Sequence, residues 1–420
     1  MLKAIKIQIY PDNEQKVYIA KLLGSCRFVY NNCLAYKTDK YNNEKNNISF
    51  KDLGKYLTEL KKKEKYCWLN DSHSKVLQQS LINLEYAYKS FFKNNQGFPK
   101  FKSKKDNKQT CRFPVDAIGK INGNQISIIR QLKNINFKCS IIDEKYLNKN
   151  QNLIKSATLT RTKSNKYYFS ILIEKTNTKI LSKTNNIIGI DLGIKDFIID
   201  SNGNKFKNLK LIRNNGKKLI KLNRQLNKKT NDSNNKNKAR IKLAKFNEKL
   251  NNIKENYLHE VTNKLLNENQ VIVMENLNVN GMLKNHKLAK SIQELSLYRF
   301  KEMLKYKANW YGREIIEIDR FYPSSKLCNC CGYKNNDLSL KDRSWKCPTC
   351  HTNHNRDYNA AKNILKEGQR ILSIKENKIG LSSPELTLED YPPMDDKAAM
   401  PLKSSDRLRQ EKNELLYNII

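Results

Sequence analysis

Five of the ten cysteines crowd into one short stretch, with spacings typical of a metal site. The motif CNCCG supplies Cys328, Cys330 and Cys331, and CPTC supplies Cys347 and Cys350. Pairing Cys328 with Cys331 gives two Cys-x2-Cys knuckles, and each knuckle can present two thiolates to one tetrahedral ion. We therefore expect a zinc ribbon with one structural Zn2+ that serves folding. Its four ligands would be Cys328, Cys331, Cys347 and Cys350.

Other residues of this stretch offer alternative ligands. Cys330 is left over by the pairing, because adjacent Cys330 and Cys331 would need a strained turn to share one ion. His351 or His354 could replace a thiolate, although the regular cysteine spacing favours four sulfurs. The other five cysteines are scattered along the chain, so the crowding favours a metal in a reducing compartment over disulfides. Free thiols are the alternative to a metal site.

Three acidic residues stand at the ends of predicted regular elements. Asp191 lies near the end of the apolar strand NIIGIDL, Glu275 ends the apolar run VIVME, and Asp357 begins a helix after HNR. Acids so distant in sequence can converge on one point only if cations offset their repulsion. Mg2+ is the natural occupant, because hard divalent ions take carboxylate oxygens. Two such ions about 4 Å apart activate a water and stabilise the leaving oxygen in phosphodiester hydrolysis.

Each acid also has a simpler structural interpretation. Asp357 can be a favourable charge in a first helical turn, and Glu275 can be a surface residue at a strand end. Asp191 is harder to explain in this way, because its neighbours are glycine and branched aliphatic residues. The residues alone therefore leave two alternatives, a three-acid site and three separate acids.

The net charge predicts a polyanionic partner. The chain has 80 Lys and Arg against 41 Asp and Glu, a formal net charge of +39. Self-repulsion on this scale is relieved when a protein binds nucleic acid. A composition bias, visible in runs such as NKKTNDSNNKNK, explains the choice of Lys over Arg but not the sign of the charge. Together with a carboxylate metal site, the charge predicts an enzyme that cuts nucleic acid.

The amino-terminal half is predicted to be a small β-barrel that a helical lobe interrupts. Residues 1–10 alternate as the first strand, and residues 11–96 show the three- and four-residue spacing of helices. Residues 97–180 return to short strands, with a hairpin turn at Asn122-Gly123.

The carboxyl-terminal half is predicted to be an α/β domain over residues 181–367. It carries the three acids, and the zinc ribbon at 322–352 is inserted before its last helix. Residues 208–268 are predicted to be helical, with a break at 227–238. Beyond the domain, residues 368–420 have nearly balanced charge and contain the segment SSPELTLEDYPPMDD, so we expect a flexible, disordered tail.

Membrane and export signals are not expected in this chain. It has no hydrophobic run of about 18 residues, and a strand pattern follows Met1 directly. The sequence therefore predicts a protein without a membrane span or signal peptide, located in the cytoplasm and associated with the nucleoid.

These motifs together resemble the TnpB family, transposon-encoded RNA-guided DNA nucleases related to type V CRISPR effectors. The resemblance covers nearly all of residues 1–367. The segments that carry it are GSCRFVYN (24–31), GFPKFKSKK (97–105), GIDLGIKDF (189–197), VMENL (273–277), RFYPSSKLCNCCG (320–332), RSWKCPTC (343–350) and NRDYNAAKNI (355–364).

The resemblance implies a fold and a site. In this family an RNase H-like (RuvC) nuclease domain, a mixed sheet flanked by helices, carries an inserted zinc ribbon. A small β-barrel interrupted by a helical recognition lobe precedes it. Asp191, Glu275 and Asp357 match the three Mg2+-binding RuvC acids, and the cysteines match the zinc module. All catalytic positions match, which argues against the family's nuclease-inactive relatives, and Cys330 is the one departure in the first knuckle.

The resemblance also implies partners. Such proteins bind a transposon-end RNA whose 3′ portion is the guide, recognise a short motif in double-stranded DNA and cleave the strands that guide pairing opens. A companion transposase acting on the same element is implied as well. Lys75 and Gln79, on one face of one predicted helix, are candidates for recognising the motif. Arg27, Lys100 and Lys102 are candidates for backbone contact, with a solvated basic surface as the alternative.

The expected function is therefore RNA-guided, Mg2+-dependent DNA endonuclease activity. One alternative is a non-cleaving RNA-guided regulator of transposition or transcription. A compact CRISPR effector is another, and a transposase performing strand transfer itself is a third. The zinc ribbon before the third acid favours the guided nucleases over the last of these.

Overall fold

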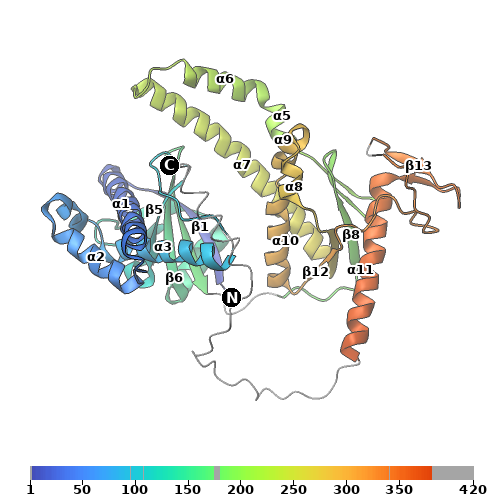
Figure 1. Ribbon diagram of the computed structural model, residues 1–420, viewed down its shortest axis with the longest axis horizontal. Coiled ribbons are helices and arrows are strands. Elements are labelled where there is room, and N and C mark those ends of the chain that lie inside the picture. Colours follow the sequence, from blue (N-terminus) through green and yellow to red (C-terminus); the bar gives the residue numbers. More distant parts are fainter. Residues whose placement is uncertain (1, 95, 107, 175–179, 340, 381–420) are drawn as a thin grey trace. The chain divides into compact units, whose positions relative to one another are not determined.

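The computed structural model describes residues 2–94, 96–106, 108–174, 180–339 and 341–380 (Figure 1). Within these ranges the chain forms two sheets, each with its own hydrophobic core, and a separate two-stranded hairpin. The first sheet belongs to the amino-terminal half, and the second belongs to the half that carries the three acids.

The first sheet has seven antiparallel strands in the order β2-β6-β7-β1-β5-β4-β3. Asn165, in the turn between β6 and β7, has a φ of 60°. The described ladders do not close the predicted barrel: β2 and β3 are the edge strands, and helix α3 (Ser74–Asn94) packs along β2. The strands are β1 (Leu2–Tyr10), β2 (Lys108–Pro114), β3 (Ile121–Asn122), β4 (Gln125–Ile126), β5 (Ile135–Lys138), β6 (Ile154–Thr162) and β7 (Tyr167–Glu174).

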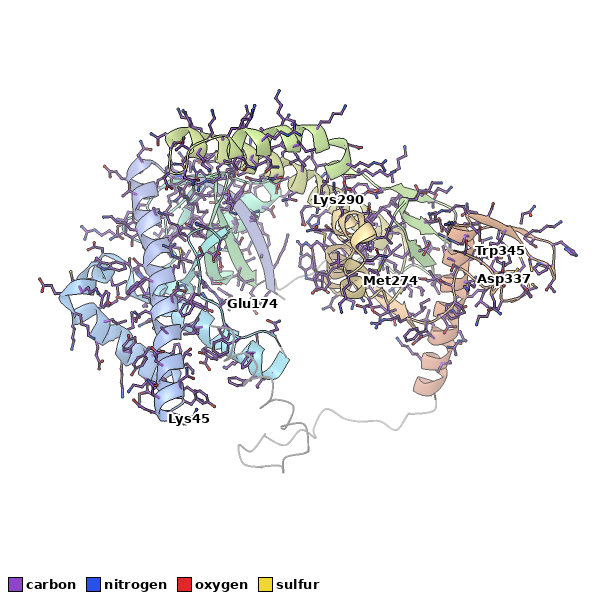
Figure 2. The ribbon with its side chains drawn as sticks, turned by 45° about the horizontal axis from the view of Figure 1, so that its top comes forward. Lys45, Glu174, Met274, Lys290, Asp337 and Trp345 are labelled. Atoms are coloured by element: carbon purple, nitrogen blue, oxygen red, sulfur yellow. The ribbon has the colours of Figure 1, made fainter. Side chains whose placement is uncertain are left out.

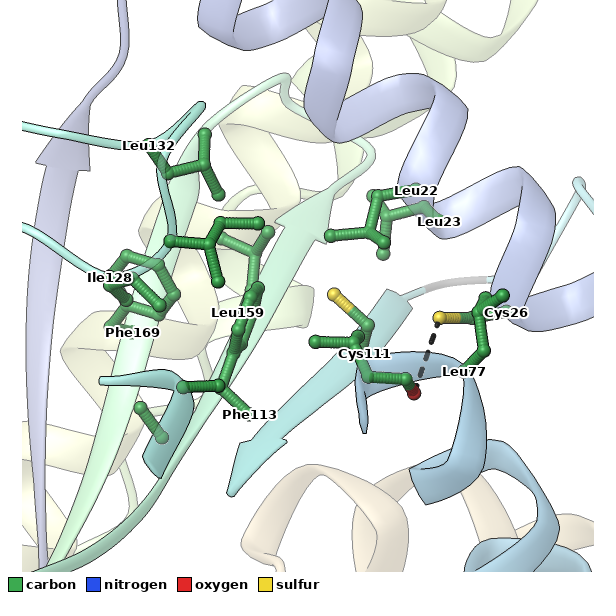
Figure 3. Close-up of a cluster of buried hydrophobic side chains, with 14 of the residues drawn as sticks. Leu22, Leu23, Cys26, Leu77, Cys111, Phe113, Ile128, Leu132, Leu159 and Phe169 are labelled. Carbon is green, nitrogen blue, oxygen red and sulfur yellow. Dashed lines mark hydrogen bonds between the residues drawn. The ribbon is translucent and has the colours of Figure 1, made fainter. Parts of the chain in front are cut away.

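The helical lobe lies within the predicted residues 11–96. Its elements are α1 (Asn13–Glu44), α2 (Phe50–Lys62), the 3-10 segment η1 (Glu64–Asp71) and α3. Helix α1 begins at a capping box, in which Asp12 and Gln15 each accept a hydrogen bond from the other's backbone N–H. Figure 3 shows how Leu22 of α1 and Leu77 of α3 share one core with Phe169 of β7. The lobe and the first sheet therefore fold around a common hydrophobic cluster.

Shorter elements complete this half. They are the 3-10 segments η2 (Val115–Ala117) and η3 (Gln151–Leu153) and helix α4 (Ile141–Lys149).

The second sheet has five strands in the order β10-β9-β8-β11-β12. Strands β8, β11 and β12 are parallel, and β9 runs antiparallel between β8 and β10. Parallel neighbours require crossover connections, and the helices supply them. The strands are β8 (Ile187–Leu192), β9 (Asp196–Asp200), β10 (Lys205–Lys207), β11 (Val271–Glu275) and β12 (Glu314–Ile318).

The helices of this half differ from prediction at one place, because the break expected at 227–238 is only residues 228–233. Farther along, Ser296 has a φ of 55° and separates two consecutive helices. The division lets Leu295 and Leu297 both enter the core beside the sheet. The helices are α5 (Leu211–Asn214), α6 (Gly216–Asn227), α7 (Asn234–Glu268), α8 (Val279–Leu283), α9 (His286–Leu295), α10 (Leu297–Tyr311) and α11 (Arg356–Gly380).

Helix α11 corrects the predicted start of the tail. We expected flexibility from residue 368, but α11 continues to Gly380, and residues 381–420 lie outside the described part of the chain. A Cβ at Gly368 would lie 2.9 Å from the Cβ of Val273 and closer still to its methyl groups. The residue taken as the first of the tail is therefore a point where the helix packs directly on the sheet.

A second glycine brings α11 against β8. A Cβ at Gly189 would lie 2.6 Å from the backbone nitrogen of Leu365 and closer to the carbonyl oxygen of Ala361. Figure 1 shows α11 beside β8 and across it from α10, while Ile188 and Ile190 point into the core that contains α7 and α10. The glycine face of β8 is thus the face that α11 covers.

We predict that Gly189→Ala destabilises this half of the chain by about 1–3 kcal/mol, because backbone atoms of α11 occupy the space of the new methyl group. Urea unfolding followed by circular dichroism would measure the change. Gly54→Ala is the control, since nothing lies near a Cβ at that helical position, and it should leave stability unchanged or raise it by up to about 1 kcal/mol. Equal effects of the two substitutions would contradict the close packing.

Candidate active site and zinc module

Strands β8 and β11 place the first two acids side by side. Their parallel register pairs Gly189 with Val273 and Ile190 with Met274, so Asp191 and Glu275 are the next residues along. Side chains alternate along a strand, and Gly189 and Val273 both face α11. Asp191 and Glu275 therefore share the α11 face, at the carboxyl ends of the two strands.

Helix α11 brings the third acid. Asp357 lies in its first turn, four residues before the Ala361 carbonyl that approaches Gly189. The negative charges of Glu275 and Asp357 both act on the carboxyl group of Asp191, so the three predicted acids face the same edge of the sheet. Among the described residues, the sets of three or more ligand atoms within 4.8 Å of one another come from cysteines and His354, so the three carboxylates stand farther apart than that.

The protein environment makes this cluster a poor place for three negative charges. Burial, followed by the charges of Glu275 and then Asp357, raises the pKa of Asp191 to about 8. Burial also raises the pKa of Glu275. A hydrogen bond that the Ser324 hydroxyl donates to Oε1 of Glu275 at 2.5 Å lowers this pKa and so offsets part of the effect. A divalent cation would relieve both effects, so the donor set and its electrostatics fit Mg2+.

Two arginines contact the third acid. The Nε and Nη2 atoms of Arg356 donate to Oδ1 of Asp357 at 3.1 and 3.0 Å, and Nη1 of Arg343 donates to Oδ2 at 3.3 Å. Arg356 also lowers the pKa of Asp191, in opposition to the acids. The cluster therefore already contains positive charge, which the spacing of the acids did not predict.

Two buried asparagines connect α11 to the segment that enters the zinc module. Asn359 donates to the carbonyl of Leu327 and accepts from the backbone N–H of Asn329. Asn363 donates to the carbonyls of Ser324 and Leu327 at 2.7 Å. The same segment thus holds Ser324 against Glu275. Neither role was predicted from the sequence, although the motifs PSSK and NAAKN contain the residues.

The predicted zinc ribbon forms beside this helix. It contains the hairpin of β13 (Ser344–Lys346) and β14 (Asn353–Asn355), and Figure 2 shows Trp345 and Asp337 in it. Sulfur atoms lie 3.5 Å apart in the pair Cys328–Cys350 and 3.6 Å apart in Cys331–Cys347. All four sulfurs lie within 4.8 Å of one another, a cluster compatible with one tetrahedral zinc ion.

The alternative ligands lie around this cluster. His354 is buried, with its Nε2 3.0 Å from the sulfur of Cys328, and the exposed Cys330 is hydrogen-bonded to the side chain of Asn329. A second possible ligand set combines Cys328, Cys330 and His354. Hydrogen bonds from Thr352 lower the pKa of Cys350 to about 6, which favours the thiolate that a metal needs.

Three models of protein families match the chain. They are a helix-turn-helix domain at residues 1–46, a "Probable transposase" at 170–286, and a "Cas12f1-like, TNB domain" at 298–364. A protein of Streptomyces pristinaespiralis named "Putative RNA-guided DNA endonuclease" is 34% identical over 371 residues, which cover 87% of this chain and 89% of that protein. A protein of Escherichia coli (strain K12), "Putative RNA-guided DNA endonuclease InsQ", is 30% identical over 89% of this chain and 94% of its own length. The chain belongs to the TnpB family.

A solved structure shows a similar fold. The "Cryo-EM structure of the Cas12f1-sgRNA-target DNA complex" contains a chain that matches with a TM-score of 0.54 and 14% identity, over 87% of this chain and 98% of that one. The TnpB-family chain described here therefore has a fold shared with a Cas12 effector. None of its described helices is long and apolar enough to cross a membrane.

The predicted nucleic-acid contacts lie in the helical lobe and the loop that follows it. Lys75 and Gln79 both lie on α3, but the ammonium group of Lys75 forms an ion pair with Asp116. The ammonium group of Lys102 lies 3.9 Å from the ring centre of Tyr30, and burial lowers its pKa. The other two candidates differ in exposure, since Lys100 is exposed and Arg27 is partly buried.

Asp191→Asn should stabilise the protein in magnesium-free buffer, increasingly so as the pH rises. The folded-state pKa of Asp191, about 8, lies above the ordinary value of 3.8. The protonated carboxyl group therefore stabilises the parent protein fully below about pH 4, and this contribution is lost as the pH rises through 8. The free energy of unfolding of the variant, relative to that of the parent, should rise by on the order of 1 kcal/mol per pH unit between those values.

Urea unfolding at pH 5.5, 7.0 and 8.5 would measure this difference. Asp196→Asn, in the neighbouring strand β9, is the matched control. A difference that does not change with pH would contradict the assigned environment of Asp191.

Cys347→Ser should remove the bound zinc and unfold the β13–β14 hairpin, because the buried sulfur of Cys347 belongs to the four-sulfur cluster. Cys330→Ser, in the same module, should keep one zinc ion per chain. Elemental analysis of the purified variants would decide the ligand set. Metal loss in Cys330→Ser, with retention in Cys347→Ser, would overturn the assignment.

Proposed function

We propose that this chain is a transposon-encoded RNA-guided DNA endonuclease that hydrolyses phosphodiester bonds with Mg2+ next to a short DNA motif. The observation that carries the proposal is the convergence of Asp191, Glu275 and Asp357 at one edge of the second sheet. Relatives of nearly the same length are named as RNA-guided DNA endonucleases, and the +39 charge suits nucleic-acid partners.

The second sheet supports a RuvC-type nuclease domain over residues 181–367. In chain order its strands lie 3-2-1-4-5, with the second antiparallel to its neighbours, and helices cover both faces. This is the mixed sheet flanked by helices that an RNase H-like domain requires. The zinc ribbon lies between β12 and α11, directly before the third acid.

The three acids would hold two Mg2+ ions, and these ions would activate a water and stabilise the leaving oxygen. The chain's own residues keep the acids in place. Ser324 orients Glu275 through its hydroxyl group, and Asn363 anchors the backbone of Ser324. Arg343 and Arg356 orient Asp357.

The proposed partners are a transposon-end guide RNA and double-stranded target DNA, on which the protein would act at the nucleoid. Base pairing with the guide would select the target, while the protein recognises the backbone and the adjacent motif. Gln79 and Lys100 are the better placed contact candidates, because Lys75 and Lys102 already have intramolecular partners. A companion transposase acting on the same element is part of the proposal.

We expect a discrete RNA that ends at the transposon boundary to copurify with the chain when it is expressed with its genomic flanks. Sequencing the copurified RNA would measure this. A heterogeneous mixture would mean that the basic surface binds RNA without selection, and the guided function would be wrong.

Asp191→Ala should lower cleavage of a guide-matched supercoiled plasmid by about 10³-fold or more, because it removes a metal ligand. Guide RNA binding should be unchanged, because the substitution removes a carboxylate and none of the candidate contact residues. Glu302→Gln, an exposed acid on α10, is the control and should cleave like the parent. Guided DNA binding without cleavage by the parent would favour the non-cleaving regulator.

A further inference from the structure

Both carboxylate oxygens of Asp357 are occupied by arginine, and the two arginines differ in exposure. Arg356 donates twice to Oδ1, and its side chain is 13% exposed. Arg343 donates once to Oδ2 at 3.3 Å, and its side chain is 51% exposed. The first arginine is held within the protein, whereas the second can turn into solvent without repacking a core.

The hairpin of the zinc module fixes the backbone positions of both arginines. Arg343 immediately precedes β13, and Arg356 immediately follows β14. The backbone N–H of Arg356 donates to the carbonyl of Arg343 at 2.9 Å, so the hairpin keeps the two residues side by side. A change at Asp357 can therefore move the Arg343 side chain while its backbone stays in place.

A divalent ion at the acid cluster would need an oxygen of Asp357, and Oδ2 is the more available one, because Arg356 donates twice to Oδ1 and Arg343 donates only once to Oδ2. A guanidinium and a metal ion cannot both take the same lone pairs of Oδ2, so each competes with the other. Once released, a guanidinium suits a phosphodiester, because its planar set of N–H groups matches phosphate oxygens. Arg343 thus has one partner in the metal-free protein and a chemically similar anion available when DNA is bound.

We propose that Arg343 is an exchangeable counter-ion: it pairs with Asp357 Oδ2 when the divalent ions are absent and moves to a phosphate of the DNA strand when they bind. Arg356 stays with Oδ1 and acts as a positioning residue that fixes the orientation of Asp357. The phosphate contact rests on the proposed function, whereas the competition for Oδ2 does not.

The test uses the zinc-loaded full chain and Mn2+ as the probe, with free Mn2+ followed by electron paramagnetic resonance. Arg343→Gln should bind Mn2+ about fivefold more tightly than the parent, because the competing charge is gone and the pair is partly exposed. Arg343→Lys should lie between the two. Arg299→Gln, which breaks an exposed pair with Glu255 on other helices, is the matched control and should leave Mn2+ affinity unchanged.

A second readout tests the move to phosphate. In the guided complex at saturating Mn2+, Arg343→Gln should cleave DNA about tenfold more slowly, since the metal sites are filled and only the phosphate contact is missing. Unchanged or weaker Mn2+ binding by Arg343→Gln would overturn the exchange, even if cleavage falls. If Arg343→Gln binds Mn2+ more tightly but the parent complex never cleaves DNA, the competition for Oδ2 would stand and the proposed function would be wrong.

Discussion

The close contact between α11 and the second sheet is the constraint on which the candidate site depends. There is no room for a side chain at Gly189 or Gly368, so the helix backbone rests directly on β8 and β11. Two acids come from strand ends and the third from the first turn of this helix. Their relative placement is therefore set by how closely the helix packs on the two strands. The helix also carries Asn359 and Asn363, which hold the entrance of the zinc module.

The electrostatics of the three acids explains why a hydroxyl group and two arginines contact them. Burial, together with the charges of Glu275 and Asp357, opposes the ionisation of Asp191 and raises its pKa to about 8. The protein offsets part of this cost with the hydroxyl of Ser324 and the two arginines on Asp357. Those groups belong to the zinc module or to residues flanking its hairpin. The zinc module and its flanking residues therefore contact the acids directly, through a hydrogen bond to Glu275 and ion pairs with Asp357.

Much of the fold follows from local sequence signals. Alternation predicted β1, short apolar runs predicted β8 and β11, and cysteine spacing predicted the four-sulfur cluster. The acids could be placed at element ends for the same reason. Other features depend on contacts between distant segments. The continuation of α11 past Gly368 reflects its packing on Val273, and the ion pair of Lys75 with Asp116 joins the lobe to the 3-10 segment η2. Such contacts join residues distant in sequence, so the hydrophobic periodicity of a single segment cannot predict them.

A crystal structure of the zinc-loaded protein soaked in Mn2+, with anomalous scattering used to locate the manganese, would test the metal site most directly. We expect manganese bound by carboxylate oxygens of Asp191, Glu275 and Asp357 together. Manganese held by only one of these acids, or found elsewhere while all three stay metal-free at saturating concentration, would contradict the claim that helix and sheet assemble them into one metal site.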